Sequence, residues 1–198
     1  MADACQQLLG KIANCRLCEA QLPLGAKPIL QADSAARILI AGQAPGSITH
    51  QRGRPFDDAS GERLRRWLNV DSDTFYNPSL FAIVPMGFCY PGRGNGGDAP
   101  PRPECAATWR QALLATLPNF QLTLLLGRYA IEWHLAGNPL AKAPLSTLTE
   151  QWQQMWPNVM VLPHPSPRNN RWLAQHPLFE TEQLPRLQHR IAELLYDA

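Results

Sequence analysis

Residues 37–61 read RILIAGQAPGSITHQRGRPFDDASG and predict a buried strand that runs into an elaborate loop. The apolar run over residues 37–41 is continuous rather than alternating, which is typical of a parallel strand covered on both faces. A glycine-rich turn follows at residues 42–46, and such a turn lets backbone N–H groups approach a phosphate or another ligand. The turn matches neither the dinucleotide-binding fingerprint nor the phosphate-binding loop of nucleotide hydrolases.

Three further apolar runs predict partner strands, at residues 80–84 (LFAIV), 122–126 (LTLLL) and 159–162 (VMVL). Helical patterns occur at residues 4–14, 61–68, 103–117, 128–135 and 184–196. Ser60 is the expected N-cap of the helix at residues 61–68. This alternation predicts a three-layer α/β/α fold around a central four-stranded, mostly parallel sheet. The length of 198 residues fits one domain, residues 1–198.

Three loops that follow predicted strands are long or rich in Pro, Gly and Arg. They span residues 42–60, 85–102 and 163–171. In open α/β sheets, ligands bind in the crevice beyond the carboxyl ends of the strands. We therefore expect the three loops to form one composite site.

The composition is that of an ordinary globular protein. No stretch approaches the roughly 20 apolar residues of a membrane span, and the first 15 residues lack the apolar core of a signal peptide. We therefore expect a cytoplasmic monomer with no membrane partner. The net charge of +2 does not by itself indicate nucleic-acid binding, and only three of the 18 basic residues are lysine. Arginine suits phosphates and base edges, but a codon bias explains the excess equally well.

Four of the five cysteines form two pairs. Cys15 and Cys18 stand in a C-x2-C motif, and Cys89 and Cys105 bracket the loop YPGRGNGGDAPPRPE. Structural disulfides are rare in a reducing compartment, so metal binding and plain burial are the alternatives. Four thiolates can hold zinc or an iron–sulfur cluster, and the spacing is unusual for a zinc ribbon. Cys5 stands outside this pattern and is expected to be structural.

Two loop residues are candidates for contact with a ligand. Pro45 and Pro55 stiffen the first loop, so the backbone that carries the aromatic side chain of Phe56 is restricted. A position in the core is also typical of Phe. His164 opens the motif HPSPRNN directly after the predicted strand at residues 159–162. A histidine so placed is either a satisfied structural residue or a catalyst.

These motifs together resemble the uracil-DNA glycosylase superfamily in order and in spacing. G-x-A-P-G followed by G-x-P-F, within residues 42–56, resembles motif one of the thermophile-type family four. That family carries an iron–sulfur cluster, a C-x2-C near its start and a second cysteine pair across a Pro/Gly loop. HPSPRN resembles motif two and is closest in wording to the single-strand-selective monofunctional glycosylases. The similarity runs from residue 15 to residue 171, which is most of the chain.

The resemblance implies a role for each matched residue. Phe56 would stack on a base flipped out of DNA, and His164 would hydrogen-bond a carbonyl oxygen of the departing base. The turn at residues 42–46 would line the pocket, and motif two would press into the minor groove or onto phosphates. The substrate-binding residues so implied are Phe56, Gly42, Ala44, Pro45, Gly46, Ser166, Arg168 and Asn169.

The resemblance also implies a cofactor. Its ligands would be Cys15, Cys18, Cys89 and Cys105. Together they would hold a 4Fe-4S cluster that braces the loops and takes no redox part in the reaction. The partner would be DNA.

Two positions depart from family four. That family has Glu as the second residue of motif one, whereas this chain has Gln43, which cannot act as a base and is expected to orient other groups. Family four also has Asn in N-V-V-K-C to recognise the uracil edge, whereas this chain reads P-M-G-F-C and places Pro85 there. Proline has no side-chain hydrogen bond to offer. Recognition of uracil therefore needs other contacts, or the base is a different one.

Asp58 is the carboxylate expected to replace the missing Glu. Cleavage of an N-glycosidic bond places positive charge on the sugar and negative charge on the base, so a carboxylate or directed water near the sugar helps. Asp58 would activate that water, or would accept a proton from an exocyclic amine of another base. The alternative is a solvated residue or a cap of the helix at Gly61. Asp57 should point away from the pocket, and His50 is expected to be exposed and not catalytic.

The sequence therefore favours a monofunctional DNA glycosylase that flips and hydrolytically removes uracil or a related damaged base from DNA. His164, Asp58 and Gln43 are the predicted catalytic residues. Neither motif contains a lysine that would form a Schiff base, so no lyase step is expected. The alternatives are a glycosylase for a different modified base and a non-catalytic DNA-binding member of the superfamily.

Overall fold

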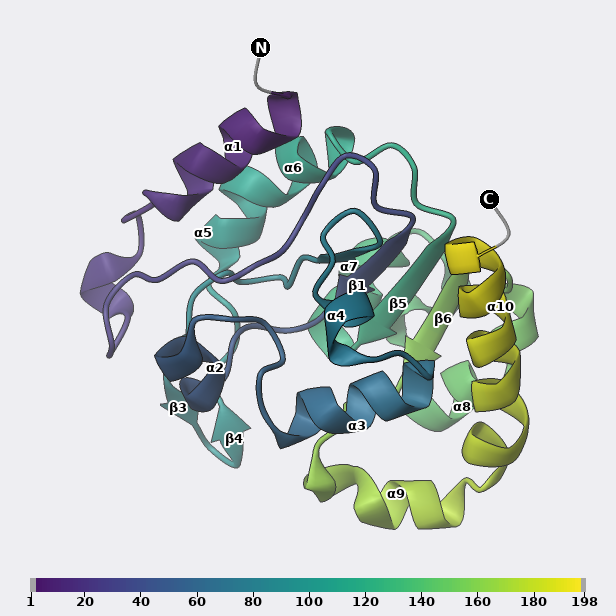
Figure 1. Ribbon diagram of the computed structural model, residues 1–198. Helices are drawn as coiled ribbons and strands as arrows, with labels where there is room; N and C mark the ends of the chain where they lie inside the picture. The colour runs from purple at the N-terminus through teal and green to yellow at the C-terminus, as the bar shows by residue number, and fades with distance from the viewer. Residues whose placement is uncertain (1–2, 197–198) are drawn as a thin grey trace.

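A sheet of four parallel strands forms the centre of the protein (Figure 1), which the computed structural model describes over residues 3–196. The strands are β1 (Ile38–Ala41), β2 (Phe81–Ile83), β5 (Leu122–Leu126) and β6 (Val159–Leu162), in the order β2-β1-β5-β6. The register pairs Ile40 with both Ile83 and Leu124. The predicted four-stranded sheet is confirmed, and each of its pairings is parallel.

Helices cover both faces of this sheet. The first face packs against α3 (Ala59–Leu68), α9 (Asn170–Gln175) and α10 (Leu184–Tyr196). The second face packs against α1 (Ala4–Ala13), α6 (Gln111–Ala115), α7 (Arg128–His134) and α8 (Leu145–Glu150). Along β1, Ile38 and Ile40 belong to the first core, whereas Leu39 and Ala41 belong to the second, as the pleat requires. The predicted three-layer architecture is therefore confirmed.

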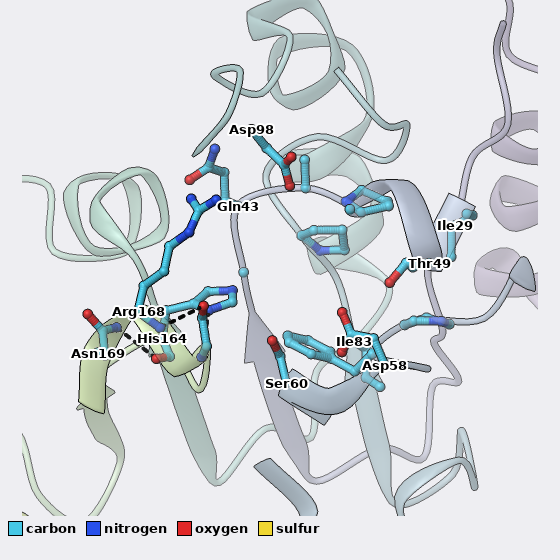
Figure 2. Close-up of a pocket in the computed structure, with 18 residues that line it drawn as sticks. Ile29, Gln43, Thr49, Asp58, Ser60, Ile83, Asp98, His164, Arg168 and Asn169 are labelled. Carbon is cyan, nitrogen blue, oxygen red and sulfur yellow. Dashed lines mark hydrogen bonds between the residues drawn. The ribbon is translucent and has the colours of Figure 1, made fainter. Parts of the chain in front are cut away.

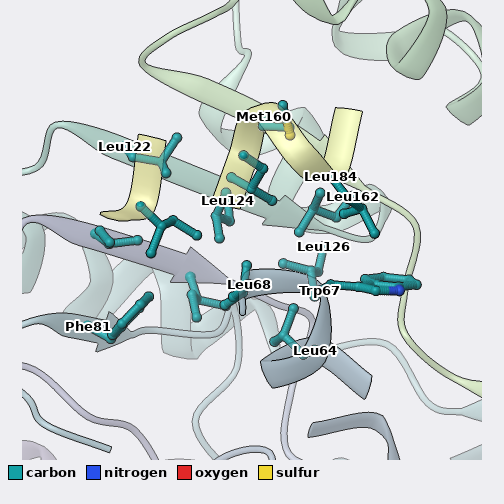
Figure 3. Close-up of a cluster of buried hydrophobic side chains, with 14 of the residues drawn as sticks. Leu64, Trp67, Leu68, Phe81, Leu122, Leu124, Leu126, Met160, Leu162 and Leu184 are labelled. Carbon is teal, nitrogen blue, oxygen red and sulfur yellow. The ribbon is translucent and has the colours of Figure 1, made fainter. Parts of the chain in front are cut away.

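The core on the first face is built from large aliphatic and aromatic side chains (Figure 3). Leu64, Trp67 and Leu68 of α3 are almost fully buried against the strands. Leu124 and Met160 are wholly buried on the strands beneath the helices. Burying side chains of this size contributes roughly 1.5–3 kcal/mol each, so this layer fixes where α3 lies and hence where its N-terminus points.

Short elements fill the connections between the main layers. The helical ones are α2 (Ser47–Arg52), α4 (Ser72–Phe75), α5 (Pro103–Cys105), η1 (Glu19–Gln21), η3 (Pro139–Lys142), η4 (Trp152–Gln154), η5 (Pro167–Asn169) and η6 (Phe179–Gln183). A small antiparallel hairpin joins β3 (Arg93–Gly94) to β4 (Gly97–Asp98). No helix described within residues 3–196 combines the length and apolar character that a membrane crossing demands.

Two of the predicted helices differ in detail. The helix predicted over residues 103–117 contains a π-helical turn, η2 (Ala106–Arg110), between α5 and α6. The cap predicted at Ser60 is wrong, because Asp58 is the N-cap of α3. Its Oδ1 accepts a hydrogen bond from the Gly61 amide at 2.8 Å, so the helix begins at Ala59. An aspartate in extended backbone can reach the amide three residues on, which satisfies one of the helix's free donors.

A buried arginine joins η2 to the end of β2. The Arg110 side chain is 0 % exposed, and its Nη1 donates to the carbonyls of Val84 and Pro85. Its Nη2 lies 2.7 Å from His134 Nε2, and its guanidinium lies 5.0 Å from the centre of the Trp133 ring. Because a guanidinium has no acceptor, His134 Nε2 must accept and the ring is neutral. Arg110 therefore fixes the backbone where β2 leaves the sheet.

Replacing His134 by glutamine should reduce the loss of stability in acid. Burial, followed by the charge of Arg110, lowers the pKa of His134 from 6.5 to about 3. Between these values the unfolded chain binds a proton that the folded protein excludes, so stability falls as the pH falls from 6.5 towards 3. Glutamine can accept from Arg110 without titrating. Urea unfolding from about pH 7 to about pH 4.5 should therefore show a shallower decline for His134→Gln; identical declines would contradict this assignment.

Candidate functional site

A pocket of about 430 Å³ opens beyond the carboxyl ends of the parallel strands (Figure 2). Every residue predicted for catalysis or substrate binding lines it, including Phe56, Asp58 and His164. Because parallel strands end at one edge, the loop after β1 and the loop after β6 meet there although they lie more than 100 residues apart.

The backbone of Phe56 has a conformation that few non-glycine residues adopt. Its φ is 51°, in the left-handed region. The Phe56 carbonyl accepts hydrogen bonds from Tyr76 Oη at 3.1 Å and from Arg65 Nη1 at 3.4 Å. Gly61 packs directly on the same carbonyl, since a Cβ built on that glycine would lie 1.6 Å from the oxygen. The start of α3 therefore holds Phe56 in a conformation that costs about 1–3 kcal/mol.

The Phe56 ring forms one wall of the pocket. Its Cζ would lie 3.7 Å from a Cβ on Gly42, an ordinary van der Waals separation, so the ring lies directly beside the first glycine of the turn. On its other side the ring packs against the core and meets Phe75 edge to face, with centroids 6.4 Å apart. Phe56 is thus half-buried, with part of its ring available to the pocket.

His164 approaches the pocket from the loop after β6. The Ser166 amide donates to His164 Nδ1 at 3.2 Å, and Asn169 Nδ2 donates to the His164 carbonyl at 2.7 Å. With Nδ1 accepting, the proton of the neutral ring is on Nε2, which makes that atom a donor. Burial lowers the pKa of His164, whereas the charges of Asp58 and Asp98 oppose this shift. The ring still meets solvent at the pocket mouth, and the lowered pKa keeps it neutral near pH 7.

Asp58 and Gln43 both line the pocket, and each is also tied to the protein. Asp58 uses Oδ1 to cap α3, in agreement with the alternative reading of Asp58 as a helix cap. Its second carboxylate oxygen is not used by the cap and belongs to a residue that lines the pocket. Gln43 donates through Nε2 to the Ala99 carbonyl at 3.1 Å. Asp57 pairs with Arg52 at 3.2 Å and with Arg54 at 3.3 Å and is not among the pocket residues, as predicted.

Several pocket residues were not predicted. Asp98 reaches the pocket from the β3–β4 hairpin, and Thr49 and Ser60 add hydroxyl groups. The glycine-rich NGGD sequence signals a tight turn, but it gives no indication that the turn folds back over the first loop. Ile29 enters from the segment before β1.

Other side chains have surroundings that the sequence did not indicate. Arg168, predicted to contact DNA, donates through Nη1 to the Gly96 carbonyl at 2.8 Å and is exposed. His50 is partly buried rather than exposed, because its ring packs near Tyr90 with centroids 6.2 Å apart. Asn77 and Asn95 do not line the pocket.

The four paired cysteines surround a second, smaller cavity. Cys15, Cys18, Cys89 and Cys105 all line it. The Trp109 indole donates to Cys15 Sγ at 3.2 Å, and the Phe88 amide points at Cys105 Sγ at the same distance. No group of three His, Cys, Asp or Glu side chains within residues 3–196 is arranged to hold a metal ion. Cys5 lies elsewhere, fully buried in the core of the second face, as expected for a structural residue.

The protein environment disfavours free thiolates in this cavity. Burial raises the pKa of Cys105 to about 12, and burial also raises the pKa of Cys18 and that of Cys89. A bound metal would have to displace these protons, as metals bound to thiolates do. Arg110 is buried but is not among the residues that line this cavity, and its guanidinium contacts the carbonyls of Val84 and Pro85.

Comparison with known families agrees with this geometry. The family model described as uracil DNA glycosylase superfamily matches residues 30–188. The match covers most of the chain and includes the whole sheet and both loops that form the pocket. The protein therefore belongs to the uracil DNA glycosylase superfamily, whose members act on DNA.

Replacing Gly61 by alanine should destabilise the protein by at least about 2 kcal/mol, the scale of an overpacked site. The added Cβ would collide with the Phe56 carbonyl at 1.6 Å, and a backbone atom cannot move aside as a flexible side chain would. Gly10→Ala is the matched control, because a Cβ there meets nothing within 4 Å in an exposed part of α1. Urea unfolding should show the control unchanged or more stable by up to about 1 kcal/mol. Equal stability of Gly61→Ala and the wild type would refute the contact.

Proposed function

We propose that this protein is a monofunctional DNA glycosylase that flips a base out of DNA and hydrolyses its bond to the sugar. The base would be uracil or a related damaged base. One observation carries the proposal: a rigidly held aromatic ring, Phe56, and a neutral histidine, His164, line the same pocket. The pocket volume of about 430 Å³ lies within the range of small-molecule sites, so it has room for a nucleoside.

The two residues would perform complementary tasks. Flipping a base costs a few kcal/mol, and stacking on Phe56 would return part of that free energy. As the glycosidic bond breaks, negative charge grows on the base, and His164 Nε2–H would donate to the oxygen that carries it. The backbone of the Gly42–Gly46 turn would hold the base and sugar against this donor.

A carboxylate would act at the sugar. Asp58 has one oxygen left after capping α3, and that oxygen would orient or deprotonate the attacking water. The amide of Gln43 does not transfer protons at this step, and its role would be to orient the loop and the base. Bond cleavage by water, with no lysine in either motif, gives a free base and an intact DNA backbone.

The four cysteines around the second cavity would hold a 4Fe-4S cluster. A cluster is larger than a single ion, in keeping with thiols that surround a cavity. When bound, the cluster would brace the loops at residues 15–18 and 89–105 without a redox step in base removal. A monomeric protein in the reducing cytoplasm would suit both these thiols and this function.

Single-turnover rates test the catalytic assignment. On uracil-containing oligonucleotides, His164→Ala and Asp58→Asn should each lose at least about 100-fold, the scale of a lost donor or general base. Gln43→Ala should lose less. Asparagine is as good an N-cap as aspartate, so Asp58→Asn removes the charge and keeps the start of α3.

Asp71→Asn provides the control for this exchange. Asp71 caps α4 through the Thr74 amide at 2.8 Å, and it lies outside the pocket. Its substitution should leave the rate unchanged. If Asp58→Asn keeps full activity, Asp58 is only a helix cap. If the wild type binds DNA but releases no base from a panel of modified oligonucleotides, the non-catalytic alternative is favoured.

Protein purified without oxygen should be brown and absorb broadly at about 400 nm, as thiolate-bound iron–sulfur clusters do. Iron and acid-labile sulfide should each approach about four per chain. Cys18→Ser should lose iron, whereas Cys5→Ala, which changes a thiol outside the set, should retain it. Colourless protein that contains stoichiometric zinc would exclude the cluster.

A further inference from the structure

The pocket contains a second carboxylate that the proposed mechanism leaves unused. Asp98 ends β4, and Figure 2 shows its side chain on the same rim as Gln43, away from Asp58 and Ser60. Its carboxylate approaches the first loop, since a Cβ on Gly46 would lie 3.5 Å from Oδ2. None of the hydrogen bonds and ion pairs within residues 3–196 engages this carboxylate. It is therefore available to a ligand.

The hairpin that carries Asp98 is held from two sides. Arg168 donates to the Gly96 carbonyl at 2.8 Å, and Gln43 donates to the Ala99 carbonyl at 3.1 Å. Gly97 allows the first contact, because a Cβ there would lie 2.8 Å from Arg168 Nη1. Asp98 stands between these two anchors, so its backbone is fixed relative to both loops of the pocket.

The rim near the hairpin presents the Asp98 carboxylate and the Gln43 amide beside the guanidinium of Arg168. Gln43 donates one of its two amide N–H groups to Ala99, and no hydrogen bond within residues 3–196 engages its oxygen. A carboxylate such as that of Asp98 accepts hydrogen bonds and donates none. His164, by contrast, presents its Nε2–H from the loop after β6. A base that satisfies both groups presents an oxygen to His164 and a hydrogen-bond donor to Asp98.

We infer that Asp98 is a specificity-determining residue that accepts a hydrogen bond from an exocyclic amino group of the flipped base. The inference rests on the proposed function, because it requires a flipped base in this pocket. A keto oxygen at the same position would face the carboxylate oxygens without a shared proton. The protein therefore prefers an amino-bearing base to the corresponding keto-bearing base.

The test compares bases that differ in this group and in the ring N–H that accompanies the keto form. 5-Hydroxycytosine and 5-hydroxyuracil form a pyrimidine pair, and isoguanine and xanthine form a purine pair. For at least one pair, the wild type should release the amino-bearing base at least about 10-fold faster, because a polar site rejects an analogue that leaves it unpaired. Asp98→Asn, whose amide both donates and accepts, should lose or reverse that preference. Asp98→Ala should abolish it, and Asp73→Asn, the same charge change on exposed α4, should keep it.

Binding separates this inference from the proposed function. Oligonucleotides that carry the same bases on 2′-fluoro-arabinose, which resists cleavage, report recognition without chemistry. If the wild type binds the amino-bearing members more tightly and releases none of the bases, glycosylase activity fails and the role of Asp98 stands. If bases are released but neither rate nor affinity distinguishes the members of either pair, the role of Asp98 fails and the glycosylase stands. A preference that survives in Asp98→Ala also overturns the inference.

Discussion

The parallel hydrogen-bonded ladder through β2, β1, β5 and β6 is the constraint on which the site depends. Its strands are buried on both faces, so each needs apolar side chains in both directions and helices above and below. With all four strands pointing the same way, their carboxyl ends share one edge. The loops after β1 and β6 are thereby brought together, and the pocket forms where polar side chains are free of the core.

At that edge, a strained backbone conformation lowers the stability of the protein but holds the Phe56 ring in a fixed position. Phe56 stands in the left-handed region with its carbonyl held by Tyr76 and Arg65, and the contact with Gly61 leaves no room for a larger residue. On the far side of the sheet edge, Arg110 is buried with its guanidinium on the carbonyls of Val84 and Pro85. Two backbone segments that line one pocket are therefore fixed by interactions that lie outside it.

The sequence predicted the helices and strands that are determined by the pattern of their own residues. The apolar runs at residues 122–126 and 159–162 match β5 and β6 residue for residue, because apolar side chains occupy all but one position of these strands. The start of α3 was misplaced by two residues, since Asp58 and Ser60 are both good caps and only the backbone angles of Asp58 decide between them. Asp98 was not predicted to line the pocket, because its position depends on hydrogen bonds from Arg168 and Gln43 to the hairpin. These bonds join segments that are distant in the chain.

The segment from Cys89 to Cys105 begins and ends at the same cavity, so its two ends lie close together in the fold. The free-energy cost of closing such a loop rises only slowly with length, by about 0.6 kcal/mol for each doubling. Residues can thus be added, removed or exchanged between these anchors while the sheet and both cores keep their packing. The part of the pocket rim that lies between these cysteines can therefore be redesigned without changes to the sheet. Natural variants can diverge at the same segment.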